Sequence, residues 1–341
     1  MKFLFVLYVS RSGSTFLTTN LARCGERLLV LPELDAVGPL VEAGTNCAGS
    51  LDSLVSRISA DRHWKSLGLD RNDLAAVLAL AADKGLKVAL EGLGSAVAER
   101  RNVAPPDVLV LKRGNQLAYA DTLVTALADD CAFLHVYRDP RAVCNSMNRA
   151  RRVEASRQVM SRGSPLYVAR YWNRYLAGVR ELSTIATVLE IRYESLIAAT
   201  SSELSSLLDA LSERWCEDLR KDGGATLVEA TIHSSERTGI HALAAAKPDD
   251  SRTRAHENEM TSFHKRIIEH FCNLEMRRRG YDTGEPLSQG GVVLAYLLHG
   301  ARMIQYTMQR AVMHALRALR RPAPAARCTS VRTRHTGNPD V

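Results

Sequence analysis

The sequence predicts an α/β fold with three layers, in which helices cover both faces of a central parallel sheet. Short apolar runs recur along the chain with helical patterns between them, which is typical of βαβ units. We expect strands at residues 3–9, 28–31, 88–90, 108–111, 132–137 and 187–191. The first and the last two of these strands run into polar turns that contain arginine or tyrosine. Since ligands of parallel sheets bind beyond the carboxyl ends of the strands, these three turns are expected to converge on one site.

The first strand is expected to lead into an anion-binding turn. Its apolar residues are followed directly by Ser10-Arg11-Ser12-Gly13-Ser14-Thr15, and then by a helical pattern from Phe16. The free N–H groups at the start of such a helix favour an anion, Gly13 permits close approach of the backbone, and the hydroxyl groups add donors. Gly13 precedes Ser14 where a Walker loop needs lysine, so this turn is not the nucleoside-triphosphate version.

A second anion site is predicted at the end of the strand at 132–137. That strand ends in Arg138-Asp139-Pro140-Arg141, where Pro140 suits the first turn of a helix and Asp139 is placed to cap it. Ser146 then lies two turns into the helix. A guanidinium makes bidentate contacts to phosphate, and the serine hydroxyl adds a donor.

These two segments resemble the nucleotide-binding motifs of the sulfotransferases, which use 3′-phosphoadenosine 5′-phosphosulfate (PAPS). The resemblance covers roughly residues 3 to 282 and implies a P-loop-like sulfotransferase fold. It also implies that residues 11–15 hold the 5′-phosphosulfate, and that Arg138 and Ser146 hold the 3′-phosphate. The function implied is transfer of the sulfuryl group to a hydroxyl or amine by in-line attack, with PAPS as co-substrate and no metal required.

Weaker resemblances extend the implied nucleotide site. Arg192-Tyr193-Glu194-Ser195-Leu196 resembles a family stretch that would place Tyr193 near the adenine, although packing of Tyr193 on the next helix explains it equally well. Arg237, in a segment with His233, resembles a residue that reaches the nucleotide in bacterial relatives. Ser251 and Arg252 are the best match to the segment that closes over the 3′-phosphate, but the chain lacks the family's usual Arg/Lys-Gly or Trp-Lys there.

Sulfuryl transfer needs a base on the acceptor side, and Glu33 is our candidate. It follows the strand at 28–31 and Pro32, and Pro32-Glu33-Leu34 resembles a Gly-Glu-Leu motif of some bacterial members. A solvated loop glutamate is the alternative. Asp35 and Glu91, the latter after the expected strand at 88–90, are rivals for the same role. Arg11 is expected to stabilise charge on the leaving-group side, and Lys112 to contact substrate or sulfate.

Composition is that of one α/β domain with a tail. The chain has 341 residues, of which 46% are hydrophobic and 24% charged, enough for one sizeable core. We assign residues 1–285 to the domain, with 46–82 as a helical insertion over the site, and residues 286–341 to an arginine-rich tail. Seven cysteines without metal-ligand spacing indicate free thiols in the cytoplasm. The first apolar run is too short to span a membrane, and we expect it to be a strand rather than a signal peptide.

Charge is concentrated in that tail. Residues 286–339 contain eight arginines and no acidic residue, which accounts for nearly all of the net charge of +8, so whole-molecule steering toward nucleic acid is not expected. Residues 292–321 have helical periodicity, with histidine, arginine and glutamine on one face and Leu, Val, Met and Tyr opposite. Two placements are open. The helix lies on an anionic membrane at the inner surface, or it docks on the body with a solvated arginine face, the second being preferred.

Two other functions were considered. A magnesium-dependent small-molecule kinase shares the fold, but it needs a loop lysine and a strand-end aspartate that the sequence does not place. A non-catalytic nucleotide- or membrane-binding protein would bind nucleotide without turnover. The acceptor is expected to be a small molecule, a carbohydrate or a glycolipid. The motifs do not choose among these, because acceptor pockets are built from variable loops.

Overall fold

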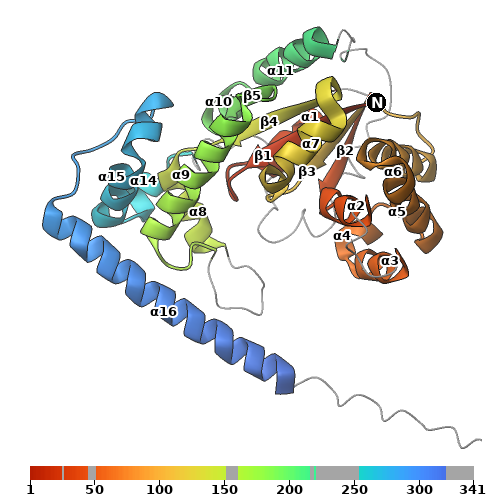
Figure 1. Ribbon diagram of the computed structural model, residues 1–341. Coiled ribbons are helices and arrows are strands. Elements are labelled where there is room, and N and C mark those ends of the chain that lie inside the picture. The colour runs from red at the N-terminus through yellow and green to blue at the C-terminus, as the bar shows by residue number, and fades with distance from the viewer. Residues whose placement is uncertain (25–26, 45–50, 151–159, 216–218, 220–252, 320–341) are drawn as a thin grey trace, which may run out of the picture.

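The computed structural model describes all residues except 25–26, 45–50, 151–159, 216–218, 220–252 and 320–341. Five parallel strands form one sheet in the order β2-β3-β1-β4-β5 (Figure 1). The strands are β1 (Lys2–Tyr8), β2 (Leu28–Glu33), β3 (Val108–Lys112), β4 (Cys131–Tyr137) and β5 (Val188–Arg192). The predicted parallel α/β sheet is confirmed.

Helices cover both faces of this sheet. Those of the first half of the chain are α1 (Ser14–Leu21), α2 (Val37–Gly44), α3 (Leu51–Ala60), α4 (Arg62–Lys65), α5 (Arg71–Lys84), α6 (Leu86–Arg100), η1 (Gln116–Tyr119), α7 (Ala120–Leu127) and η2 (Ala128–Asp130). The second half contributes α8 (Pro140–Arg149), α9 (Pro165–Leu182), α10 (Tyr193–Ala198), α11 (Thr200–Trp215), α14 (Ala255–Glu259), α15 (Ser262–Arg278) and α16 (Gln289–Leu319).

Alternation along the strands produces two cores. In β1, the side chains of Phe3, Phe5 and Leu7 pack on one face with α2, α5, α6, α8, α9 and α15. Leu4 and Val6 pack on the other face with α1, α10 and α11. All five side chains are fully buried, as expected for a central parallel strand covered on both sides. This is the three-layer arrangement that the sequence predicts.

The strand predicted at 88–90 is wrong. These residues lie inside α6, which begins after Gly85 at φ 85°. Ala89, Leu90, Leu93 and Val97 are buried along one side of that helix, so the three apolar residues belong to a helical period rather than to a strand. A run this short fits either pattern, and the turns of helix that follow decide it.

Helix α16 packs on the body with the opposite face from the one expected for the docked placement, in which the arginine face is solvated. Among its residues up to Val312, Ala295 and Tyr306 are buried, and His299 Nδ1 lies 2.9 Å from the hydroxyl of Ser164 at the start of α9. The polar edge that contains His299 therefore lies against the body. The apolar face is exposed, and α16 extends beyond the body in Figure 1. No helix in the described part of the chain is long and apolar enough to cross a membrane.

Candidate functional site

The turn after β1 has an unusual backbone conformation and packs closely against Tyr193. Arg11 has φ 75° and Gly13 has φ 92°, both in the left-handed region, and the amide of Ser12 donates to the carbonyl of Val9 at 3.0 Å. Gly13 precedes α1, whose first turn has no acidic residue and no side-chain cap. A Cβ on Gly13 would lie 2.1 Å from the Tyr193 ring, so this position requires glycine. Gly13 at the N-cap provides no side-chain cap for the first turn of α1, and the amino end of a helix favours an anion.

Arg138 lies at the centre of the convergence. Its side chain is only 7% exposed, its Nη1 donates to the carbonyl oxygen of Arg11 at 3.2 Å, and its guanidinium stacks 4.4 Å from the centroid of the Tyr193 ring. Arg11 Nε donates to the hydroxyl of Ser146 at 3.0 Å. The three segments expected to converge therefore touch one another, and they follow three adjacent strands, β1, β4 and β5.

Residues that the sequence did not predict hold Arg138 and its helix in place. Trp172 of α9 donates its Nε1–H to the carbonyl of Arg138 at 3.2 Å. Asp139 caps α8 by accepting from the amide of Arg141, as predicted. The carboxylate of Glu194 accepts from the amide of Asp139 at 3.0 Å and from the Tyr281 hydroxyl at 2.9 Å. The contacts of Trp172 and Glu194 join segments far apart in the chain, so no local pattern could have indicated them.

Burial does not neutralise Arg141, which anchors the same helix to α15. Burial alone would lower the pKa of its guanidinium, but hydrogen bonds and charge interactions with Asp139 and Glu269 raise that pKa above its usual value. The Asp139 Oδ2 and Glu269 Oε1 contacts are 2.7 and 2.8 Å long. Arg141 therefore stays charged and fixes the first turn of α8 beside Arg138.

A second group of polar side chains lies at the carboxyl ends of β1, β3 and β2. Lys112, only 2% exposed, donates its Nζ to the hydroxyl of Thr15 at 3.2 Å. Glu33 ends β2 and pairs in register with Lys112. Burial, and then the nearby Glu33 carboxylate, raise the pKa of Tyr8 well above its usual value. The sheet therefore brings Glu33, Lys112 and the anion turn to one edge.

Two further polar groups lie at this edge: Ser12, which the resemblance assigns to the nucleotide site, and Gln116, which the sequence did not indicate. The hydroxyl of Ser12, whose residue is 1% exposed, has no hydrogen-bond partner among the described residues. Both amide atoms of the buried Gln116 likewise lack a partner within the described part of the chain. Buried polar atoms are normally paired, so unpaired ones beside an anion turn are consistent with a ligand contact.

Glu91 does not belong to this site. It was expected at a strand end, but it lies in α6 with its carboxylate 3.9 Å from the amino group of Met1. That amino group marks the start of β1, at the opposite edge of the sheet from the anion turn. The expected role of Glu91 as a rival base is therefore wrong, because it depended on the wrongly predicted strand at 88–90.

Asp35, two residues after Glu33 in the chain, borders a cavity of about 450 Å³. Its carboxylate accepts from the amide of Gly38 at 3.0 Å, at the start of α2. Helices α3 and α4 also border this cavity, so helical residues of the 46–82 segment lie beside the site. The lining residues are Asp35, Gly38, Pro39, Val41, Glu42, Arg57, Ile58, Asp61, Trp64, Arg113 and Tyr119. His233, Arg237, Ser251 and Arg252 lie outside the described residues.

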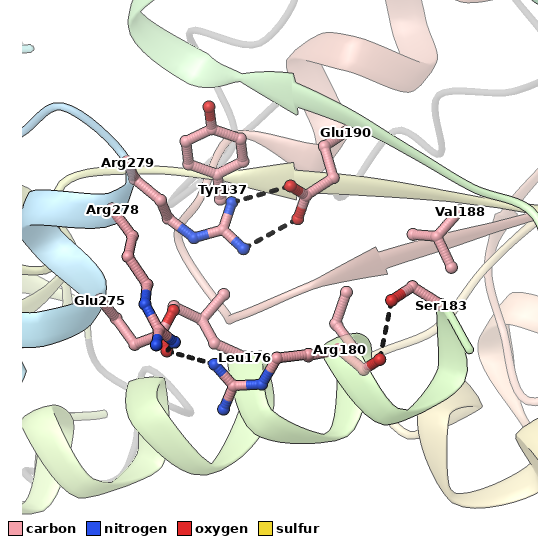
Figure 2. Close-up of a pocket in the computed structure, with 10 residues that line it drawn as sticks. Tyr137, Leu176, Arg180, Ser183, Val188, Glu190, Glu275, Arg278 and Arg279 are labelled. Atoms are coloured by element: carbon pink, nitrogen blue, oxygen red, sulfur yellow. Dashed lines mark hydrogen bonds and ion pairs between the residues drawn. The ribbon is translucent and has the colours of Figure 1, made fainter.

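Another cavity, of about 370 Å³, lies beside the edge strand β5 (Figure 2). Its charges are paired with one another. Arg279 holds Glu190 through two contacts of 2.9 and 3.1 Å, and Glu275 accepts from Arg180 and Arg278 (Figure 2). Because these arginines and glutamates pair with one another, the described lining of the cavity offers neither an unpaired arginine for an anion nor an unpaired carboxylate as a base. We therefore assign it a structural role.

The Glu190 cluster makes stability dependent on pH. Burial lowers the pKa of the fully buried His135, whose Nδ1 lies 2.8 Å from Glu190. Burial alone would raise the pKa of Glu190, but hydrogen bonds from His135 and Arg279 lower it to about 2. The unfolded chain therefore binds protons that the folded chain does not. The unfolded chain takes up a proton at His135 below about pH 6.5 and at Glu190 below about pH 4.3. Protonation of either group therefore favours the unfolded chain on acidification.

We expect the unfolding free energy from urea titrations to fall between pH 7.5 and pH 5. The variant His135→Phe, which keeps an aromatic ring beside Tyr137 and Tyr175, should show a smaller fall. An equal fall in the variant would show that His135 does not contribute.

Comparisons with known proteins bear on the family and the fold of this chain. A family model described as the sulfotransferase family matches residues 4–217, more than half of the chain. The "Sulfotransferase Domain from the Curacin Biosynthetic Pathway" aligns with a TM-score of 0.52 at 16% identity, covering 82% of this chain and 98% of that one. The "Sulfotransferase Domain from the Synechococcus PCC 7002 Olefin Synthase" aligns with a TM-score of 0.44 at 16% identity, covering 87% and 94%. No curated protein matches in sequence.

The family match includes the turn after β1, the start of α8 and Tyr193, the three segments that meet around Arg138. It also includes Glu33 and Lys112 at the neighbouring strand ends. The chain is a member of the sulfotransferase family, and its chemistry is sulfuryl transfer.

Proposed function

We propose that this sulfotransferase uses PAPS as its donor and transfers the sulfuryl group to a hydroxyl or amine acceptor. The contact of Arg138 with both Arg11 and Tyr193 carries the proposal, because it joins two expected phosphate sites and an expected adenine contact at one place. The uncapped amides of α1 suit the 5′-phosphosulfate. The guanidinium of Arg138 and the hydroxyl of Ser146 suit the 3′-phosphate.

The chemistry needs a base on one side of sulfur and positive charge on the other. Glu33 takes the proton of the acceptor as it attacks. Arg11, Lys112 and the loop amides stabilise the negative charge that grows on the oxygen bridging sulfur to the departing phosphate as that S–O bond breaks. The lysine beside the turn thus comes from β3, where Lys112 bonds to Thr15, and not from the turn itself. No step of this mechanism requires a metal.

The acceptor is proposed to enter from the cavity beside Asp35. Its lining carries both signs of charge, from Asp35 and Arg113, together with the Tyr119 ring. Such a surface suits a polar, hydroxylated acceptor, for which a carbohydrate or the headgroup of a glycolipid is our choice. The kinase alternative has no comparable support.

Calorimetric titration and thermal denaturation with 3′-phosphoadenosine 5′-phosphate test the donor assignment. At a hundred times its Kd the nucleotide should stabilise the protein by ~2.7 kcal/mol and raise Tm by several degrees, whereas ATP with magnesium should not. Stabilisation by ATP with magnesium alone would overturn the proposal.

Arg138→Ala should weaken binding of the same nucleotide by roughly ten- to a hundredfold, because charge-assisted hydrogen bonds contribute about 1.5–3 kcal/mol. Arg180→Ala is the matched control, since Arg180 pairs with Glu275 beside the structural cavity. Titration calorimetry measures both. Equal affinities in the wild type and Arg138→Ala would remove Arg138 from the nucleotide site.

A further inference from the structure

The outward face of α16 consists of exposed apolar side chains, whereas a solvated helix usually presents polar ones. Leu297 is 66% exposed and Ile304 is 65% exposed. The exposed aliphatic and methionine side chains in the described part of this helix, which we call the outer apolar face, are Val293, Leu294, Leu297, Leu298, Ile304, Met308 and Val312. Elsewhere in the described part of the chain only Leu51, Ile185 and Leu274 are exposed large aliphatic residues. Contiguous apolar surface of this kind marks a binding surface.

The opposite side of the helix fixes the direction in which this face points. Ala295 packs with Leu166 and Ile267 of the body. The Arg162 guanidinium lies 4.8 Å from the Tyr306 ring, and that of Arg170 lies 5.2 Å from the Tyr296 ring. Together with the Ser164–His299 contact, these hold the first half of α16 against α9. The outer apolar face therefore points away from the body while the helix stays attached to it.

Charge identifies the partner. Residues 286–339 contain eight arginines and no acidic residue. Arg302 and Arg310 are exposed, and by helical spacing they lie on the side of α16 opposite the apolar face, toward the body. They leave the helix positively charged next to an anionic lipid surface, whose potential attracts such charges within about a Debye length. A second copy of α16 would offer arginine but no carboxylate to pair with these charges. We propose that the outer apolar face of α16 lies in the surface of a bilayer that contains anionic lipids.

The placement of α16 relative to the site makes this attachment relevant to the acceptor. The Tyr8 amide, at the carboxyl end of β1, donates to the Tyr175 hydroxyl of α9 at 2.8 Å. Ser164, at the start of α9, lies eleven residues earlier, about 16 Å further along the helix axis at 1.5 Å per residue. Because α9 leads into the amino end of β5, its start projects past the carboxyl edge of the sheet, and α16 packs on that start (Figure 1).

A bilayer under α16 therefore lies on the side of the anion turn. Resting on the proposed function, we infer an acceptor whose hydroxyl or amine is presented at the level of the headgroups, such as a glycolipid. This step depends on sulfuryl transfer at that edge, whereas the attachment itself does not.

Vesicle flotation tests the attachment directly. The full chain is mixed with vesicles of phosphatidylcholine alone or of phosphatidylcholine with phosphatidylglycerol at three to one. The wild type should float with the second and much less with the first, and 0.5 M NaCl should reduce the effect of the anionic lipid. The variant Leu297→Gln/Ile304→Gln/Met308→Gln should bind at least tenfold more weakly. The control Ile185→Gln/Leu274→Gln changes similarly exposed residues outside α16 and should bind like the wild type.

Two outcomes overturn the proposal. One is the absence of flotation with either vesicle. The other is a dimer in light scattering that the triple substitution abolishes without any vesicle binding, since the outer apolar face would then bind a second copy. Thermal stabilisation by 3′-phosphoadenosine 5′-phosphate is measured on the same variants. If the triple variant keeps it and loses flotation, the two proposals are separated, because failure of the donor site would leave flotation unchanged.

Discussion

Replacing Gly13 with alanine is expected to abolish nucleotide binding and to destabilise the fold. The new Cβ would lie 2.1 Å from the Tyr193 ring, and φ is 92° at this residue. A left-handed conformation costs a non-glycine residue roughly 1–2 kcal/mol, and overpacking adds about 1–3 kcal/mol. The two costs add because the turn cannot relax without moving the Arg11 carbonyl away from Arg138. Urea unfolding and titration with 3′-phosphoadenosine 5′-phosphate measure the two effects.

Gly68→Ala provides the matched control for Gly13→Ala. Gly68 also has a positive φ, of 77°, but a Cβ there would meet nothing within 4 Å. It should therefore lose only the conformational part of the stability, and nucleotide affinity should not change. In a Tyr193→Ala background, Gly13→Ala should cost no more stability than Gly68→Ala does. If the cost stays large in that background, the ring is not the cause.

Glu33→Gln should reduce turnover by about 10²- to 10⁴-fold, the usual contribution of a general base. Nucleotide binding should stay intact, because Glu33 lies across β3 from the turn and is not a phosphate ligand. Turnover is followed as release of 3′-phosphoadenosine 5′-phosphate, with the first acceptor that supports it in a screen of hydroxyl and amine compounds. A non-catalytic binding protein would show no release with any acceptor.

Two other carboxylates control for this result. Glu91→Gln should be silent, because Glu91 lies at the amino edge of the sheet beside Met1. Asp35→Asn should weaken acceptor binding, raising KM more than it lowers kcat, because Asp35 borders the acceptor cavity. If Asp35→Asn removes turnover while Glu33→Gln retains it, Asp35 is the base and Glu33 is not.

Local patterns predicted the donor half of the site better than its other parts. Strand, turn and helix succeed one another between Lys2 and Leu21 and between Cys131 and Arg149, so hydrophobic runs and capping residues identify both segments. Their convergence followed from the rule that strands of a parallel sheet end at one edge. Trp172, Glu194 and Gln116 could not be found in this way, because their contacts or their burial arise from tertiary packing.

The errors have equally specific causes. A three-residue apolar run such as 88–90 carries too little period to separate strand from helix, and the assignment of Glu91 depended on it. The amphipathic pattern of 292–321 showed that the helix has two faces, but it held no information on which face packs against the body. That was decided by Ser164, Arg162 and Arg170, which lie more than a hundred residues earlier in the chain.

The order of the strands has a consequence for how specificity can change. Central strand β1 carries the turn, β4 and β5 on one side carry Arg138 and lead to Tyr193, and β3 and β2 on the other side carry Lys112 and Glu33. On the proposed assignment, the nucleotide contacts that follow β1, β4 and β5 lie on one side of the molecule, and Glu33 with the acceptor cavity lies on the other, while Lys112 of β3 reaches back to the turn. Helices grafted between β2 and β3 from another family member could retarget the enzyme while its nucleotide site is inherited unchanged.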